Sequence, residues 1–72
     1  MNDVTQLTKR ELQVLCRVAH GLPNKVIASE LWVTEQTVKF HLNNAYRKLD
    51  LSNRVAAARW GFEQGLHLTE CA

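Results

Sequence analysis

Only three residues, Trp32-Val33-Thr34, separate two segments of the chain that have the hydrophobic period of an α-helix, residues 25–31 and 35–49. A connection this short makes two helices cross at a steep angle, so the sequence predicts a helix-turn-helix. Ala28 is small enough to let the two backbones approach closely, and Val33 lies at the angle between them. The second helix has a well-marked start, because the last residue of the connection is a threonine that can cap it.

A helix is also predicted before this motif, over residues 9–20. Thr8 and Glu11 have the spacing of a capping box, in which each side chain accepts a hydrogen bond from the other residue's backbone N–H. Gly21 is typical of the position just beyond a helix C-terminus, because glycine adopts positive φ without strain. A turn is predicted to follow, with Asn24 as the cap of the next helix.

The last predicted helix, residues 54–64, is apolar on nearly all sides, and Ser52 or Asn53 can cap it. A helix at the edge of a small domain is expected to have one solvated face. Its second apolar face therefore predicts contact with a second copy of the chain or with another domain. The alternative is that Trp60 and Phe62 fold back over the core.

The predicted fold is all-α, a four-helix bundle with helices at about 9–20, 25–31, 35–49 and 54–64 and a helix-turn-helix at about 24–43. Residues 7–66 are expected to form one domain. Residues 1–6 are expected to be a flexible lead or the stump of a linker, and residues 67–72 a disordered tail.

Composition argues against catalysis and against a membrane location. A chain of 72 residues has little room for an enzyme pocket with its own walls. It contains no nucleophile elbow, glycine-rich phosphate loop or catalytic pair of carboxylates, so we expect neither enzyme activity nor a cofactor. No apolar run approaches the ~20 residues of a membrane span, and the first residues lack the order of a signal peptide.

The two cysteines lie in different surroundings, Cys16 in an apolar helical run and Cys71 in a polar tail. We therefore expect reduced thiols and a cytoplasmic protein. No metal site is expected, because His20, His41 and His67 have no ligand spacing with either cysteine.

The helix over 35–49 has two chemically different sides. One is apolar and predicts contact with the core, whereas the other is polar and basic, with no acid between Gln36 and Lys48. Amide and guanidinium groups reach base edges in a DNA major groove, and an apolar side chain beside them can contact a thymine methyl. A solvated basic face is the alternative interpretation. The polar side consists of Gln36, Phe40, Asn43, Asn44 and Arg47, with Lys39, His41 and Lys48 on its flanks.

The net charge is only +2, but the acids gather toward the two ends of the chain and leave its middle basic. Backbone N–H groups at the starts of the second and third helices would point at an anion lying across them. Phosphate contacts fix the register of a protein on DNA without specifying sequence. Thr34 is required as a cap in any case, and Arg54 can alternatively pair with Asp50 or Glu30. The expected phosphate contacts are Asn24, Lys25, Thr34, Thr37, His41, Lys48 and Arg54.

Several motifs, taken together, are specific for one family. They are Leu7-Thr8, Arg10-Glu11, Asn24-Lys25, Ile27-Ala28, Val33-Thr34, Thr37-Val38-Lys39 with His41, Lys48-Leu49 and Asn53-Arg54. On these residues the chain resembles the LuxR/GerE-type DNA-binding domain, the effector domain of NarL/FixJ-like response regulators in bacterial two-component systems. The resemblance extends from about Leu7 to Leu66. Pro23 and Val26 depart from the family pattern, in which serine and an acid are common, and neither departure threatens the fold.

The resemblance implies that the third helix enters the major groove and that the fourth forms a symmetric dimer. The implied base-reading residues are Lys39, Phe40 and Asn43. From the polar side of the helix we expect Asn44 or Arg47 to read bases in addition. The implied dimer residues are Val55, Arg59 and Phe62, with Ala57, Ala58 and Gly61 turned inward. From the residues alone, that inward stripe cannot be distinguished from one through Ala57, Trp60 and Gln64.

We therefore expect the DNA-binding domain of a bacterial transcription regulator, acting as a dimer on two half-sites of double-stranded DNA about one helical turn apart. RNA polymerase is a further candidate partner, and no small-molecule ligand is expected. The rival is a helix-turn-helix module that docks on a polymerase subunit or a receiver domain. The chain has no room for a signal-receiving part, so it is expected to be either a piece of a longer regulator or a stand-alone one.

Overall fold

The computed structural model describes residues 6–71, and within that range all regular secondary structure is helical. The elements are α1 (Lys9–Ala19), α2 (Asn24–Leu31), α3 (Glu35–Leu49), α4 (Arg54–Glu63) and a short 3₁₀ helix, η2 (Leu66–Leu68). The predicted all-α fold of four helices is confirmed, and each predicted helix begins and ends within one residue of the observed one. The predicted flexible lead lies outside the described residues apart from residue 6. None of the described helices has the length and apolar character needed to cross a membrane.

Local hydrogen bonds account for the start and the end of α1. The Glu11 N–H donates to Thr8 Oγ1 at 3.1 Å, and the Thr8 N–H donates to Glu11 Oε1 at 3.0 Å, which forms the predicted capping box. After the C-cap residue, Gly21 has a φ of +83° and its N–H donates to the Val18 carbonyl. Both ends of α1 are therefore fixed by residues next to it in sequence.

The start of α2 differs from the prediction. Pro23 occupies the N-cap position without a side-chain cap, and Asn24 is the first residue of the helix. The prediction that Asn24 caps α2 is wrong, because its Oδ1 accepts a hydrogen bond from Arg54 at the start of α4 instead. The side chain that was expected to act locally thus joins two helices.

The connection from α2 to α3 is as tight as the sequence predicts. Trp32 has a left-handed backbone with a φ of +59°, and the Val33 N–H donates to the Ala28 carbonyl at 3.0 Å. Thr34 then caps α3 by accepting a hydrogen bond from the Thr37 N–H at 3.1 Å. The result is the helix-turn-helix, with α3 crossing α2 directly after the turn.

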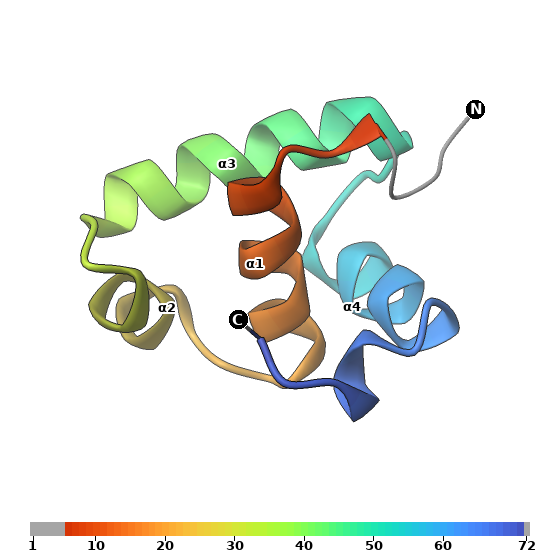
Figure 1. The fold of residues 1–72 in the computed structure, drawn as a ribbon. Helices are drawn as coiled ribbons and strands as arrows, with labels where there is room; N and C mark the ends of the chain where they lie inside the picture. The colour runs from red at the N-terminus through yellow and green to blue at the C-terminus, as the bar shows by residue number, and fades with distance from the viewer. Residues whose placement is uncertain (1–5, 72) are drawn as a thin grey trace.

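One hydrophobic core holds the helices together, and α1 lies at its centre. Figure 1 shows α3 lying across one end of α1, with α2 and α4 on opposite sides of it. The largest side chains with no solvent exposure come from three helices, Val14 and Leu15 of α1, Ile27 of α2 and Val38 of α3. This core anchors one side of α3 along its length.

The buried face of α4 follows neither of the two inward stripes that the sequence left open. Ala57, Trp60 and Gly61 are buried, so the inward face takes members of both stripes. Gly61 lies so close to α1 that a Cβ added to it would be 2.7 Å from the Cβ of Ala19. Phe62 remains 52% exposed, and its ring lies 4.2 Å from that of His67. Of the two residues that could fold back over the core, Trp60 is buried there and Phe62 is not.

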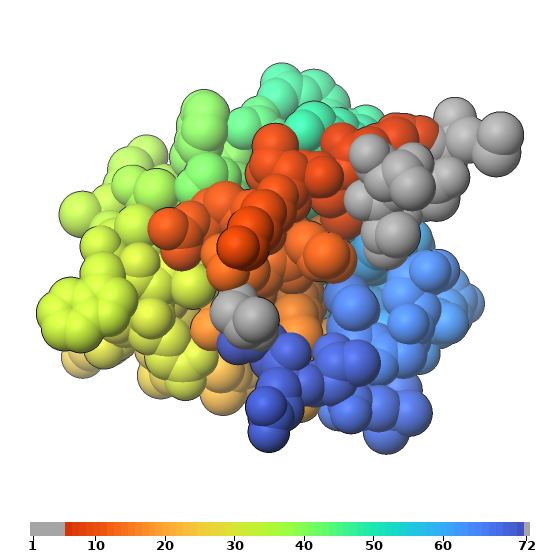
Figure 2. Space-filling view, viewed as in Figure 1, coloured from red at the N-terminus to blue at the C-terminus, as the bar shows by residue number. Residues whose placement is uncertain are grey.

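The C-terminal residues correct two predictions. Within the described range they are ordered against α1, with η2 followed by a disulfide between Cys16 and Cys71. Figure 2 shows this blue segment packed against the orange surface of α1. The structure places residues 67–71 against α1, where a disordered tail was expected, and it pairs the two cysteines that were expected to be reduced thiols. The reason is tertiary: α4 packs on α1 and directs the chain back along it, which brings together two cysteines 55 residues apart.

Candidate nucleic-acid interface

The outer side of α3 presents the residues that the sequence analysis singled out. The inner side is buried through Val38, Leu42, Ala45 and Leu49. On the outer side Lys39 and Asn43 are exposed, and Phe40 is 61% exposed. These three side chains lie within little more than one helical turn, on a helix whose opposite side is fixed in the core.

Two further candidates on α3 are bonded to each other. Arg47 donates a hydrogen bond from its guanidinium to the Oδ1 atom of Asn44. To bond a base edge, Arg47 and Asn44 would first have to break this hydrogen bond. The exposed Phe40 can contact a base without breaking a hydrogen bond. Asn44 and Arg47 are therefore occupied within the domain, whereas Lys39, Phe40 and Asn43 are exposed.

The N-terminus of α3 carries a pair of hydroxyl groups. Thr34 Oγ1 lies 3.0 Å from Thr37 Oγ1 and also accepts the Thr37 N–H. Both residues were expected to contact phosphates, and the structure places them together at the end of the helix where backbone N–H groups favour anions. At the start of α2, Lys25 is exposed.

Arg54, another predicted phosphate contact, is occupied within the domain. Its guanidinium donates to Asn24 Oδ1 at 2.7 Å and to the Leu22 carbonyl. The alternative ion pair with Asp50 or Glu30 is not formed. Arg54 therefore ties the start of α4 to the start of α2, beside the exposed lysine.

Lys48 is also occupied, because its ammonium lies 2.7 Å from the carboxylate of Glu11. This ion pair joins the last turn of α3 to the first turn of α1. Burial alone would raise the pKa of the Glu11 carboxyl, but the hydrogen bonds from Lys48 and from the Thr8 backbone, together with the charges of Lys48 and His41, lower the pKa below its ordinary value.

Two residues that position this surface escaped the sequence analysis in that role. Glu11 was assigned only to the capping box, yet it also holds the C-terminal end of α3 through Lys48. Asn24 was assigned to a cap and to a phosphate contact, yet its side chain accepts a hydrogen bond from Arg54. Their partners lie 37 and 30 residues away along the chain, so no local pattern could have identified them.

Comparison with known proteins gives the family. A family model described as bacterial regulatory proteins, luxR family, matches residues 5–61. The nitrate/nitrite response regulator protein homolog of Haemophilus influenzae is 49% identical over 63 residues, which cover 88% of this chain and 30% of that protein. The nitrate/nitrite response regulator protein NarL of Escherichia coli is 52% identical over 58 residues, 81% of this chain and 27% of that protein.

The transcriptional regulatory protein LiaR of Bacillus subtilis is 54% identical over 52 residues, 72% of this chain and 25% of that protein. The chain thus spans less than a third of the length of these relatives. With a helix-turn-helix whose second helix presents a polar, exposed side, the chain belongs to the luxR family of bacterial regulatory proteins and is a DNA-binding domain of that type.

Proposed function

We propose that this domain recognises a specific sequence in double-stranded DNA by placing α3 in the major groove. The observation that carries the proposal is the outer side of α3, where Lys39, Phe40 and Asn43 are exposed on a helix that has no acid between Gln36 and Lys48. An asparagine can bond adenine through two hydrogen bonds, a lysine can donate to guanine, and an aromatic ring can contact a thymine methyl. Asn44 and Arg47 are proposed as secondary base contacts.

Phosphate contacts would fix the register of α3 in the groove. We assign Lys25, Thr34, Thr37 and His41 to direct contact with phosphates, because they lie on α3 or at the N-terminal ends of α2 and α3. Asn24, Lys48 and Arg54 hold these elements in place through their bonds within the domain. They are assigned a positioning role, with phosphate contact secondary.

The proposed assembly on DNA is a homodimer through α4. Val55 is 72% exposed, Phe62 is 52% exposed, and Arg59 is exposed on the same helix. A two-fold contact through these residues would bury apolar surface that the monomer leaves in water. Two copies would then read two half-sites spaced by about one turn of DNA.

The names of the relatives support a proposal about the larger protein to which such a domain belongs. Two of them are named as nitrate/nitrite response regulators, so we propose that this domain is the effector part of a response regulator and works in the cytoplasm. RNA polymerase is the partner proposed for its regulatory output.

Selection of binding sites from random duplex DNA tests the proposal. We expect a single enriched motif with two half-sites, and binding of that motif should weaken steeply with added salt because phosphate contacts release counterions. The matched control is Gln64→Ala, which removes an exposed amide from the end of α4 and should leave the motif unchanged.

Failure to enrich any sequence would overturn sequence-specific recognition. Binding that does not depend on salt would instead favour the rival function, a helix-turn-helix module that docks on a polymerase subunit or a receiver domain through an apolar surface.

A further inference from the structure

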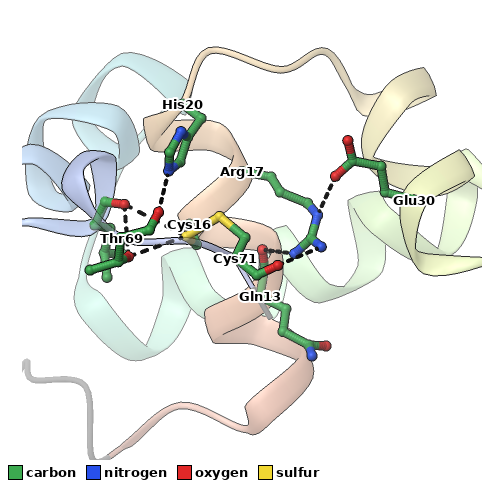
Figure 3. A network of polar contacts seen from close by, with 8 residues as sticks. Gln13, Cys16, Arg17, His20, Glu30, Thr69 and Cys71 are labelled. Carbon is green, nitrogen blue, oxygen red and sulfur yellow. Dashed lines mark hydrogen bonds and ion pairs between the residues drawn. A yellow bond between two sulfur atoms is a disulfide. The ribbon is translucent and has the colours of Figure 1, made fainter.

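Three side chains with soft or borderline ligand atoms meet at the C-terminal end of α1. The sulfur atoms of Cys16 and Cys71 and a ring nitrogen of His20 all lie within 4.8 Å of one another. Figure 3 shows Cys16 and His20 one helical turn apart on α1, with Cys71 brought to them by the tail. None of the three belongs to the proposed DNA-contacting or dimer surfaces.

We propose that the reduced form of this domain binds one Zn²⁺ ion through Cys16, His20 and Cys71. Two thiolates and one imidazole are a ligand set that zinc prefers, and in a tetrahedral site the fourth position can be taken by water. Along the chain the histidines have no ligand spacing with the cysteines, which is why the sequence predicts no metal site. The spacing exists in three dimensions instead.

Cys16 and Cys71 form the disulfide when they are oxidised, and in the proposal they bind zinc when they are reduced. A dithiol reductant supplies two electrons and two protons, which convert the S–S bond into two thiols while the reductant becomes a disulfide. Binding of Zn²⁺ then releases the two thiol protons and leaves two Zn–S bonds. The three ligand atoms lie within 4.8 Å of one another while the two sulfurs are still bonded. Two sulfur ligands at 2.3 Å from a tetrahedral zinc lie roughly 3.8 Å apart, so the sulfurs move apart once the S–S bond is reduced.

Arg17 keeps the tail in place when the S–S bond is absent. Its buried guanidinium donates to the Cys71 carbonyl at 3.0 Å, to the Gln13 carbonyl at 3.0 Å and to the Glu30 carboxylate at 2.8 Å. The Cys71 backbone is thus bonded to α1 independently of its sulfur. A ligand that is already positioned in this way costs less conformational entropy to order around a metal.

The histidine is held by a backbone carbonyl. The Nε2 atom of His20 lies 2.7 Å from the Thr69 carbonyl oxygen, so this nitrogen carries the proton in the metal-free form. Coordination through Nε2 would exchange this hydrogen bond for a Zn–N bond and move the ring proton to Nδ1. Cys71 lies two residues after Thr69. The tail therefore brings the Thr69 carbonyl and the Cys71 sulfur to the same end of α1.

A cavity gives an ion and its water a route to the cysteines. It has a volume of about 240 Å³ and is lined by residues that include Leu12, Cys16, Leu66, Thr69 and Cys71. It is open to solvent, whereas the Cys16 side chain itself is buried. Zinc can therefore reach the buried Cys16 through this cavity, and the His20 ligand is itself exposed.

The reducing conditions of the proposed cytoplasmic location make the thiols available, and to that extent the inference rests on the proposed function. Its test does not involve DNA. The intact chain is reduced with a phosphine, freed of reductant without air and titrated with Co²⁺, whose thiolate charge-transfer and tetrahedral d–d absorption bands report the ligand set. We expect saturation at one Co²⁺ per chain, loss of the bands on addition of Zn²⁺, and no bands with the oxidised protein.

Variants separate the three ligands. We expect Cys71→Ser to abolish the charge-transfer pattern of two thiolates, and His20→Gln to weaken Co²⁺ binding by at least about tenfold. His20→Gln leaves both cysteines in place, and its helix content by circular dichroism controls for folding. The matched control, His67→Gln in η2, should bind Co²⁺ as the parent chain does.

Absence of thiolate–Co²⁺ bands in the reduced parent chain would overturn the site. Equal affinity of the His20→Gln and parent chains would overturn the three-ligand assignment, and one metal per two chains in native mass spectrometry would replace it by a bridging site. A gel shift on the same samples reports DNA binding separately, so failure of either proposal is recognised without reference to the other.

Discussion

The Glu11 carboxylate and the Lys48 ammonium lie 2.7 Å apart and join the first turn of α1 to the last turn of α3. The same carboxylate accepts the Thr8 N–H, so one side chain both caps α1 and holds the C-terminal end of the helix proposed to enter DNA. The Glu11 side chain is 4% exposed and that of Lys48 35%, so water screens the pair from one side only.

This pair predicts a loss of stability in acid. The pKa of Glu11 is lowered in the folded state, so its contribution is fully present above the unfolded pKa of about 4.3 and is lost as pH falls through the lower folded value. We expect Glu11→Gln to reduce the free energy of unfolding at pH 7 by about 1–2 kcal/mol, less than for a fully buried pair because of the exposure of Lys48. Urea unfolding of both chains at pH 7 and pH 3 should show the difference shrink in acid.

The control for this experiment is Glu63→Gln, which removes an exposed carboxylate at the end of α4. It should change stability little at either pH. A difference between Glu11→Gln and the parent chain that is the same at both pH values would contradict the ionic role of Glu11.

The contact between α4 and α1 predicts an unusual response at Gly61. Replacing a glycine inside a helix by alanine ordinarily stabilises the helix by up to about 1 kcal/mol. Here the new Cβ would lie 2.7 Å from that of Ala19, so the helices must separate. We expect Gly61→Ala to destabilise the domain by about 1–3 kcal/mol in urea unfolding.

The double variant Ala19→Gly with Gly61→Ala moves the methyl group from one helix to the other. It should recover much of the lost stability. Such a recovery would show that the single variant is destabilised by the clash with Ala19 and not by a local effect of alanine on α4. A more stable Gly61→Ala single variant would show that α1 and α4 are not in such close contact.

Two substitutions distinguish base reading from phosphate contact. Asn43→Ala removes a proposed base contact and should cost about 1–3 kcal/mol of binding free energy while relaxing the preference at one base pair. Lys25→Ala should weaken binding to all sequences alike and lower the salt slope by about one. Binding measured on the selected operator and its single-base variants, at several salt concentrations, resolves both effects.

The assignment of base readers would be wrong if Asn43→Ala kept the full sequence preference. Arg54→Ala is a useful comparison, because its bonds to Asn24 and to the Leu22 carbonyl predict a loss of folding stability as well as of affinity. Asn43 is exposed, so its replacement should leave the unfolding midpoint unchanged.

The disulfide predicts redox-dependent stability. It links residues 55 apart, and in the chain-entropy description a closed loop of this length is worth about 4 kcal/mol. We expect a reductant, added with a chelator so that no metal replaces the bond, to lower the urea midpoint by a corresponding amount. Cys71→Ser should unfold at the lower midpoint and should not respond to reductant.

Much of this structure was predictable from residues close together in the sequence. The capping box at Thr8, the cap at Thr34 and the glycine after α1 each depend on hydrogen bonds within a few residues, and the observed helix ends follow them closely. The two sides of α3 follow from its helical period alone, so the exposure of Phe40 could be expected before the fold was known.

Only the tertiary structure decided the pairings between distant residues. Glu11 with Lys48, Asn24 with Arg54 and Cys16 with Cys71 are separated by 37, 30 and 55 residues. The inward face of α4 belongs to the same class, because an all-round apolar helix does not specify which side is buried. Helix ends and periods are set by local hydrogen bonds and side-chain spacing, whereas these contacts depend on the angles and distances at which whole helices pack, and those arise only when the core forms.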